Sequence, residues 1–289
     1  MASLRDVKTK IGAVKKTKQI TKAMNMVASA KLRNAQSRIE RFKPYAQKFH
    51  EMLGDLAAGA DESVHPLLAR REEKKTVGIV LVTSDRGLCG SFNANLIKAA
   101  LKLGREKQAQ GLGVKFYCVG KKGRDAIRKA DFEIVVQYRD VMNHFDFTLA
   151  SKLGQEIINS FLDATLDEVV LIYGEFVSMA HQVPVVQEIL PISGEHGEAK
   201  ESGRDYIYEP SVEGLLAELL PRFVKVQVYR GMLDTSASEH AARMSAMDNA
   251  TRACDDMIGS LTLLFNKTRQ AAITRDLMDI VGGAEALKG

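Results

Sequence analysis

The first part of the chain carries apolar residues at alternating steps of three and four. Sixteen positions between 4 and 56 follow these steps, and thirteen of them are apolar. A repeat of this period is typical of a helix that pairs along a coiled-coil seam. The positions are Leu4, Val7, Ile11, Val14, Lys18, Thr21, Asn25, Ala28, Leu32, Ala35, Ile39, Phe42, Ala46, Phe49, Leu53 and Leu56.

Three consecutive positions of this seam are polar, namely Lys18, Thr21 and Asn25. Apolar residues lie beside them at positions 20, 24 and 27. Because a seam follows its apolar side chains, we expect it to rotate onto these three residues. The surface that the helix offers to a partner would change at the same place.

The last part of the chain repeats the pattern. The same steps run through Met244, Met247, Thr251, Cys254, Ile258, Leu261, Phe265, Thr268 and Ala272. The register then slips by one residue, to a row that begins at Ile273. No proline follows Pro221, so one helix from about residue 211 to about 281 is permitted, on the order of 100 Å long. Two such helices at opposite ends of the chain predict an antiparallel coiled coil.

The middle of the chain alternates between strand and helix patterns, which predicts an α/β fold with a mostly parallel, doubly wound, Rossmann-like sheet. The predicted strands are 76–84, 114–120, 133–139, 168–176 and 183–192, and the predicted helices are 93–111, 122–130 and 146–165. We therefore divide the chain into a coiled-coil helix 1–59, an α/β domain 75–193, a loop 194–210 and a second coiled-coil helix 211–289.

Charge is distributed unevenly along the 289 residues, whose net charge is +5. Residues 1–50 hold thirteen Lys and Arg against two acids, whereas the other 239 hold 28 against 34. A basic coiled coil that binds nucleic acid is one interpretation. However, no aromatic residue precedes Phe42 to stack on a base, and the lysines are interleaved with the seam. These features favour a protein partner and no nucleic acid.

Other compositional features exclude several classes of protein. Cys89, Cys118 and Cys254 are too few and too dispersed for a disulfide framework, and the six histidines show no metal-binding spacing, so we expect no metal. No apolar run reaches the length of a membrane span. The N-terminus lacks the apolar core of a secretory signal. We expect a cytoplasmic protein.

One short stretch, TSDRGLCGSFN at residues 83–93, stands between a predicted strand and a predicted helix. Its glycines fit neither a phosphate loop nor a dinucleotide fingerprint. An enzyme with Cys89 as nucleophile is an alternative, although no base is placed beside it by the sequence. The stretch also suits a structural turn, in which Gly87 and Gly90 give backbone freedom and Asp85 or Ser91 provides a cap.

Five segments together resemble the gamma-subunit family of the F-type ATP synthases. They are ITKAMNMVASAKLRNAQ, SDRGLCGSFN, DYIYEP, SEHAARMSAMDNAT and NKTRQAAITRDLMDIVGGAEAL, in this order over nearly the whole chain. The family pattern Ile-Thr-x-Glu reads Ile273-Thr274-Arg275-Asp276 here. This departure bears on the role of the longer acid and leaves the resemblance intact.

The resemblance implies a non-catalytic rotor shaft that couples proton flow and rotation of the c-ring to ATP synthesis or hydrolysis. The implied partners are the alpha and beta subunits around the coiled coil, and the epsilon subunit and c-ring at its foot. No cofactor is implied. The implied location is peripheral, on the cytoplasmic face of the inner (plasma) membrane.

The resemblance also implies which residues contact partners. Residues in the last and first helices would face the ring of alpha and beta subunits, and residues before the last helix would lie near the c-ring. Those facing the ring are Arg269, Gln270, Thr274 and Met24, and those near the c-ring are Tyr206, Tyr208 and Glu209. Asp85 and Arg86 would make contacts on a coupling loop that packs near the coiled coil or the surrounding ring.

Overall fold

The structure is a computed structural model that describes residues 3–57, 65–71, 73–192 and 212–286. These residues form two compact units. One takes in Met1–Ala28 and Met244–Gly289, and the other takes in Ser29–Arg243. The two terminal helices contribute to both units. They are α1, Leu4–Ala57, and α5, Val212–Ala286, close to the bounds that the seam patterns predicted.

The larger unit contains a five-stranded sheet in the order β3-β2-β1-β4-β5. The first four strands are parallel, and β5 pairs antiparallel with β4. The strands are β1 Thr76–Val82, β2 Gly113–Val119, β3 Glu133–Tyr138, β4 Glu168–Phe176 and β5 Gln182–Leu190; the helices between them are α2 Phe92–Ala109, α3 Lys121–Lys129 and α4 Phe147–Leu162. The mostly parallel α/β fold predicted from the sequence is confirmed.

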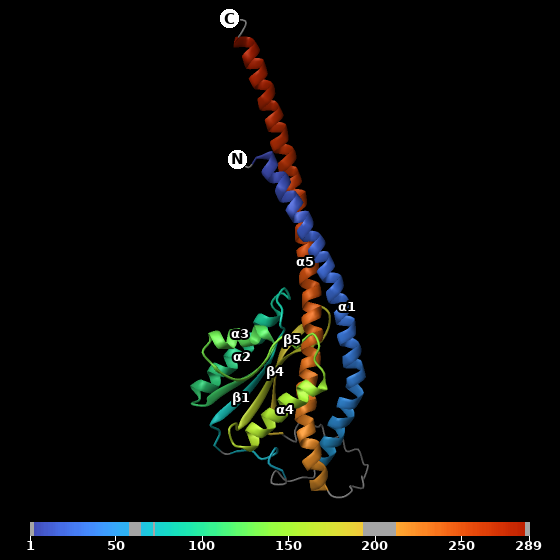
Figure 1. Cartoon of the computed structure of the whole chain (residues 1–289), viewed down its shortest axis with the longest axis vertical. Helices are drawn as coiled ribbons and strands as arrows, with labels where there is room; N and C mark the ends of the chain where they lie inside the picture. Colours follow the sequence, from blue (N-terminus) through green and yellow to red (C-terminus); the bar gives the residue numbers. More distant parts are fainter. Residues whose placement is uncertain (1–2, 58–64, 72, 193–211, 287–289) are drawn as a thin grey trace. The chain divides into compact units, whose positions relative to one another are not determined.

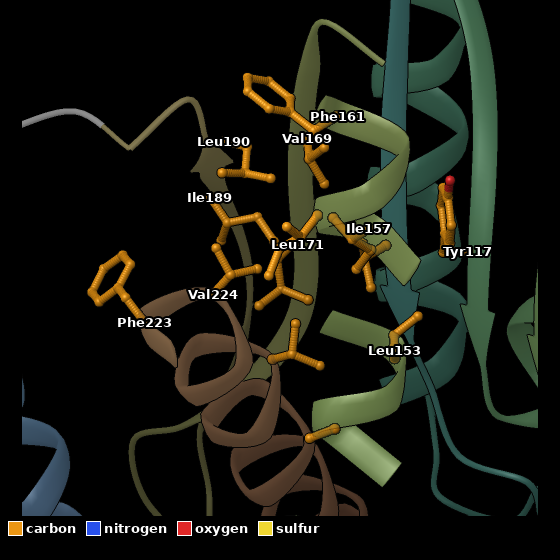
Figure 2. Packing of buried hydrophobic residues seen from close by; sticks show 14 of the residues in the cluster. Tyr117, Leu153, Ile157, Phe161, Val169, Leu171, Ile189, Leu190, Phe223 and Val224 are labelled. Carbon is orange, nitrogen blue, oxygen red and sulfur yellow. The ribbon is translucent and has the colours of Figure 1, made fainter. Parts of the chain in front are cut away.

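Helices cover both faces of this sheet (Figure 1). Helices α2 and α3 pack on one face, where Leu96 and Ile127 meet Ile79 and Phe116 in a buried cluster. Helices α4 and α5 cover the other face. Figure 2 shows Ile157 of α4 and Val224 of α5 on either side of Leu171 of β4, and Leu153 of α4 belongs to the same buried cluster. Burial of these apolar side chains on both faces accounts for the nearly continuous apolar strands.

The pairing of β1 with β4 ends at Ile172. Beyond this residue, helix α5 approaches β4 closely. The backbone N–H of Gly174 donates to Thr235 Oγ1 at 3.1 Å, and its carbonyl accepts from Ser238 Oγ at 3.0 Å. A Cβ atom at Gly174 would lie 2.5 Å from the Phe92 ring. Two polar side chains of α5 therefore satisfy peptide groups that no neighbouring strand reaches.

In the smaller unit, α1 and α5 run antiparallel to each other. Thr21 Oγ1 lies 2.8 Å from Thr251 Oγ1, and Asn25 Nδ2 donates to the Met244 carbonyl at 2.8 Å. Lys18 forms an ion pair with Asp255. Residue numbers rise along α1 while those of its partners fall along α5, which confirms the predicted antiparallel pairing.

The expected rotation of the seam is wrong. Thr21 is buried and Lys18 and Asn25 are partly buried, whereas Ile20 and Val27 are about three-fifths exposed. The seam keeps its steps through the three polar residues because each has a polar partner on α5. A satisfied polar pair removes most of the cost of leaving the seam without apolar contacts.

Candidate partner-binding surfaces

The C-terminal end of α5 exposes a row of apolar side chains. The seam residues of α5 are less exposed than their neighbours as far as Ala272, and every residue from 273 to 285 is exposed. The exposed apolar side chains are Ile273, Leu277, Met278, Ile280 and Val281. Figure 1 shows α5 continuing past the first residues of α1. The register slip predicted at Ile273 therefore marks the place where α5 loses its helical partner.

The polar residues expected at this end lie on the same exposed segment. Arg269, Gln270 and Thr274 are all exposed. Gln270 and Thr274 are four residues apart, and Leu277 and Val281 continue their row along one face of the helix. The segment thus offers an apolar stripe that begins with an amide and a hydroxyl.

A second apolar row, at positions 20, 24 and 27, flanks the seam of α1. Ile20 and Val27 are exposed, and Met24 between them is partly buried. The row is outside because Lys18, Thr21 and Asn25 occupy the seam. The sequence marked this row through its spacing but assigned it to the wrong face of the helix.

The loop after β1 is built around Asp85, whose carboxylate is buried. It accepts hydrogen bonds from the backbone N–H groups of Lys121, Asp140 and Met142, all at 2.9 Å. Asp85 therefore connects the ends of β1, β2 and β3 to the first turn of α3. It was expected to contact a partner, whereas the structure makes it a positioning residue inside the larger unit.

The rest of the loop is held by side chains from two helices. Ser84 Oγ donates to the Arg86 carbonyl at 2.6 Å, and Asn93 Nδ2 donates to Ser84 Oγ at 2.7 Å. Arg243 of α5 donates to the Gly87 carbonyl at 3.1 Å and pairs with Glu239 at 2.6 Å. The Arg86 side chain is exposed. Sequence reasoning missed Arg243, because 156 residues separate it from Gly87 and no spacing rule connects them.

Cys89 lies inside the loop rather than at its surface. Its side chain is buried, and Asn93 Nδ2 lies 3.1 Å from Sγ. Burial raises the pKa of the Cys89 thiol, which lowers the thiolate fraction that a nucleophile would need. This environment does not support the alternative of a cysteine enzyme.

The turn depends on a different pair of residues from those predicted. Gly90 has φ of 57°, as expected of a glycine that gives backbone freedom, but Gly87 is absent from the residues with positive φ. Leu88 takes that conformation instead, with φ of 63°. Ser91 precedes α2 and makes no side-chain cap hydrogen bond. The cap is made by Asp85 on the first backbone N–H of α3.

Several expectations fall on residues that the structure does not describe. Tyr206, Tyr208 and Glu209 lie outside the described residues.

Within the described part of the chain, no helix has the length and hydropathy to cross a bilayer. The same residues contain no group of three or more His, Cys, Asp or Glu that could hold a metal ion.

Comparison with known proteins places the chain in a family. A family model described as ATP synthase matches residues 3–287. The chain belongs to the ATP synthase family. One relative is named ATP synthase gamma chain and comes from Nitratidesulfovibrio vulgaris (strain Hildenborough). It is 74% identical over 291 residues, and the match covers 100% of this chain and 100% of the relative. An ATP synthase gamma chain of Lawsonia intracellularis is 55% identical, with the same coverage.

Solved structures of ATP synthases share the fold. A chain of the Tetrahymena thermophila mitochondrial ATP synthase central stalk and c-ring is 27% identical with a TM-score of 0.59, over 80% of this chain and 99% of that one. A chain of the Euglena gracilis mitochondrial ATP synthase gives a TM-score of 0.69 at 20% identity, over 98% and 94%. The fold is thus shared with chains of ATP synthases from distant organisms.

Proposed function

We propose that the chain is the central shaft of a rotary ATP synthase, a gamma-type subunit that is not itself catalytic. The observation that carries this proposal is the whole-chain match to the family and to relatives named ATP synthase gamma chain. The antiparallel pair of helices and the uncovered apolar end of α5 suit a shaft. Its partners are the alpha and beta subunits, the epsilon subunit and the c-ring.

The end of α5 contacts the surrounding alpha and beta subunits. Arg269, Gln270 and Thr274 supply polar contacts, and Leu277 and Val281 supply an apolar face. Such a surface suits a rotating contact, because apolar contacts form without the desolvation cost that burying an ion pair carries. Each rotary position shifts the populations of the beta conformations only by its difference in contact free energy.

The α1 row and the loop contribute further contacts to the same partners. Met24 lies in the row of α1 that flanks the seam, between Ile20 and Val27. Arg86 is exposed on the loop and gives a positive charge for an acidic partner surface. Asp85 supports this contact indirectly, by holding the loop in place.

The foot of the shaft lies at the membrane through the complex rather than through a membrane span of its own. Tyr206, Tyr208 and Glu209 contact the c-ring. The epsilon subunit binds near the α/β domain. The complex holds the chain as a peripheral subunit on the cytoplasmic face of the inner membrane. Proton flow through the c-ring turns the shaft during ATP synthesis.

Assembly with the other subunits tests this function directly. The chain is co-expressed with alpha and beta subunits, and the purified complex is assayed for ATP hydrolysis. We expect the chain to co-purify stoichiometrically and to have no nucleotide hydrolysis on its own. Failure to co-purify, or hydrolysis by the isolated chain, would contradict the proposal.

Two substitutions test the contacts at the end of α5. Gln270→Leu and Thr274→Ala are expected to lower the turnover of the complex while leaving the unfolding midpoint of the isolated chain unchanged, because both residues are exposed. Gln108→Leu is the matched control, since Gln108 is exposed on α2. Turnover equal to the parent in both α5 variants would remove these residues from the contact.

A further inference from the structure

Helix α1 is hydrogen-bonded at two places to residues 139–146, the turn between β3 and α4. The Lys31 ammonium donates to Asn143 Oδ1 at 2.8 Å, and the Arg38 guanidinium donates to the Phe145 carbonyl at 2.7 Å. Lys31 and Arg38 are seven residues apart, which places them two turns apart on one face of the helix. Two bonds at this spacing fix both the position and the rotation of α1 against the turn.

Arg38 joins three elements of the larger unit. Besides its bond to the Phe145 carbonyl, it donates to the Tyr229 hydroxyl of α5 at 3.3 Å. Its Cζ lies 4.3 Å from the centroid of the Phe145 ring, in a cation–π contact. A planar guanidinium can donate in several directions and stack at the same time, which an ammonium cannot do. The side chain therefore ties α1 both to the turn and to α5.

The turn that receives these bonds is itself fixed. The Asp85 carboxylate accepts hydrogen bonds from the backbone N–H groups of Asp140 and Met142, and the Met142 side chain is buried. At the other end of the turn, Asp146 caps α4 by accepting from the Leu149 N–H at 3.1 Å. The turn thus gives α1 a rigid anchorage.

Burial holds α1 less firmly than α5. From residue 231 to 241 every residue of α5 is buried, whereas among residues 29–49 of α1 only Leu32, Ala35 and Phe49 are buried. Apolar contact is non-directional, so it resists the sliding or rolling of one helix over another only weakly. Hydrogen bonds have a preferred distance and angle, and they resist such motion directly.

We propose that Arg38 is a positioning residue for rotary coupling, which fixes α1 to the turn 139–146 so that α1, α5 and the α/β domain rotate as one body under load. Lys31 supplies the second point of attachment. This inference rests on the proposed function, because the contact carries load only if the chain is a shaft. Without the attachment, part of each rotation is lost as motion of α1 against the α/β domain.

The test compares a loaded rotor with an unloaded one. Arg38→Met keeps an apolar stem of similar length but removes both hydrogen bonds and the cation–π contact. The variant is assembled into the complete synthase in membrane vesicles, and ATP hydrolysis and ATP-driven proton pumping are measured with and without an opposing proton gradient. We expect hydrolysis without a gradient to stay close to the parent. Protons pumped per ATP against the gradient should fall about threefold or more.

Two further variants separate the attachment from a general structural role. Arg38→Lys should restore part of the pumping, because an ammonium can still donate to the Phe145 carbonyl. Arg41→Met is the matched control, since Arg41 is exposed on the same helix, and it should pump like the parent. In the isolated chain, backbone amides of α1 between residues 31 and 45 should exchange with solvent about tenfold faster in Arg38→Met than in the parent.

The outcomes distinguish this inference from the proposed function. Parent-like pumping by Arg38→Met against the gradient, or an equal loss of loaded and unloaded activity, would overturn the coupling role and leave the shaft standing. A parent chain that does not assemble with alpha and beta subunits would overturn both. If Arg38→Met does not fold, Lys31→Met provides the test, since it removes the second attachment alone. It should show the same difference between loaded and unloaded turnover to a smaller extent, and its absence would overturn the inference.

Discussion

Two stretches of α5 invert the usual relation between polarity and burial. From residue 231 to 241 every residue is buried, although Asp234, Thr235, Ser238, Glu239 and His240 are polar. From residue 273 to 285 every residue is exposed, although many are apolar. The buried stretch is closed by partners inside the chain, and the exposed stretch is not. Burial in this helix therefore follows the available partners more than residue type.

Several polar groups of the buried stretch are satisfied by partners inside the chain. Thr235 and Ser238 bind the backbone of Gly174, and Glu239 pairs with Arg243. The apolar side chains of the exposed stretch would be buried only when another protein binds there. Substitutions in the first stretch should thus change folding, and those in the second should change assembly.

Gly174→Ala should give the largest change, a loss of about 3 kcal/mol in the free energy of unfolding. Its Cβ would lie 2.5 Å from the Phe92 ring, so the strand or α2 must shift. Chemical denaturation of the isolated chain measures the loss. Gly259→Ala is the control, since nothing lies within 4 Å of its Cβ and the helix should gain about 1 kcal/mol. Equal effects at the two sites would show that the close approach of the Phe92 ring to β4 is absent.

Asp234→Asn should give the next largest effect, and it should depend on pH. Burial raises the pKa of Asp234 to about 6, with Arg230 opposing the rise and Glu175 adding to it. In the unfolded state Asp234 loses its proton near pH 3.8, whereas in the folded state it keeps the proton up to about pH 6. The contribution of Asp234 to the free energy of unfolding therefore falls as the pH rises from 3.8 to about 6. At pH 7 the variant should be more stable by about 2 kcal/mol.

The difference between parent and variant must be measured, because His240 acts in the opposite sense. Burial lowers the pKa of His240 to about 4, so its contribution to stability is lost as pH falls below the unfolded value of 6.5. The difference for Asp234→Asn should shrink from pH 7 to pH 4. A difference independent of pH would contradict the raised pKa of Asp234.

Thr235→Val should cost about 1–2 kcal/mol of unfolding free energy, since the Gly174 N–H loses its acceptor while the shape is kept. Denaturant titration of the purified chain measures it. The comparable substitution at the exposed Thr262, whose hydroxyl bonds only to its own helix, should stay within about 0.5 kcal/mol of the parent. Similar losses in both variants would mean that the bond to β4 contributes nothing.

Leu277→Asn in the exposed stretch should have the smallest effect on folding, within about 0.5 kcal/mol. Leu277 is 57% exposed and has no packing to lose in the isolated chain. In the assembled complex the same change should lower turnover, because the apolar face meets a partner there. Paired measurements of unfolding and ATP hydrolysis separate the two effects. A large loss of stability in the isolated chain would show that this end is packed internally.

The sequence predicted the elements well because local periods encode them. The buried runs at 76–82 and 168–176 read as strands, and the steps of three and four carried both terminal helices to within a few residues of their ends. The seam at 18–25 was assigned wrongly because two rows, one polar and one apolar, fit the same helix. Their choice depends on Asp255 and Thr251, which lie on the other helix.

The candidate surfaces were predictable in position but not in detail. Spacing marked the apolar end of α5, and the glycines marked the loop at 83–93. The burial of Asp85, the bond from Arg243 and the strained Leu88 had no local signal. Each depends on groups brought together from β2, β3 or α5.

The sequence by itself determined where helices and strands lie, that the terminal helices carry seams, and that the last turns of α5 are apolar. These features follow from interactions between residues a few positions apart. Only the tertiary structure decided which row of α1 faces α5, why polar residues of α5 are buried, and which loop residue is exposed. Those outcomes depend on hydrogen-bond partners more than 100 positions away, at Thr251 and Arg243, or more than 60 positions away, at Gly174 of β4, and no local pattern encodes them.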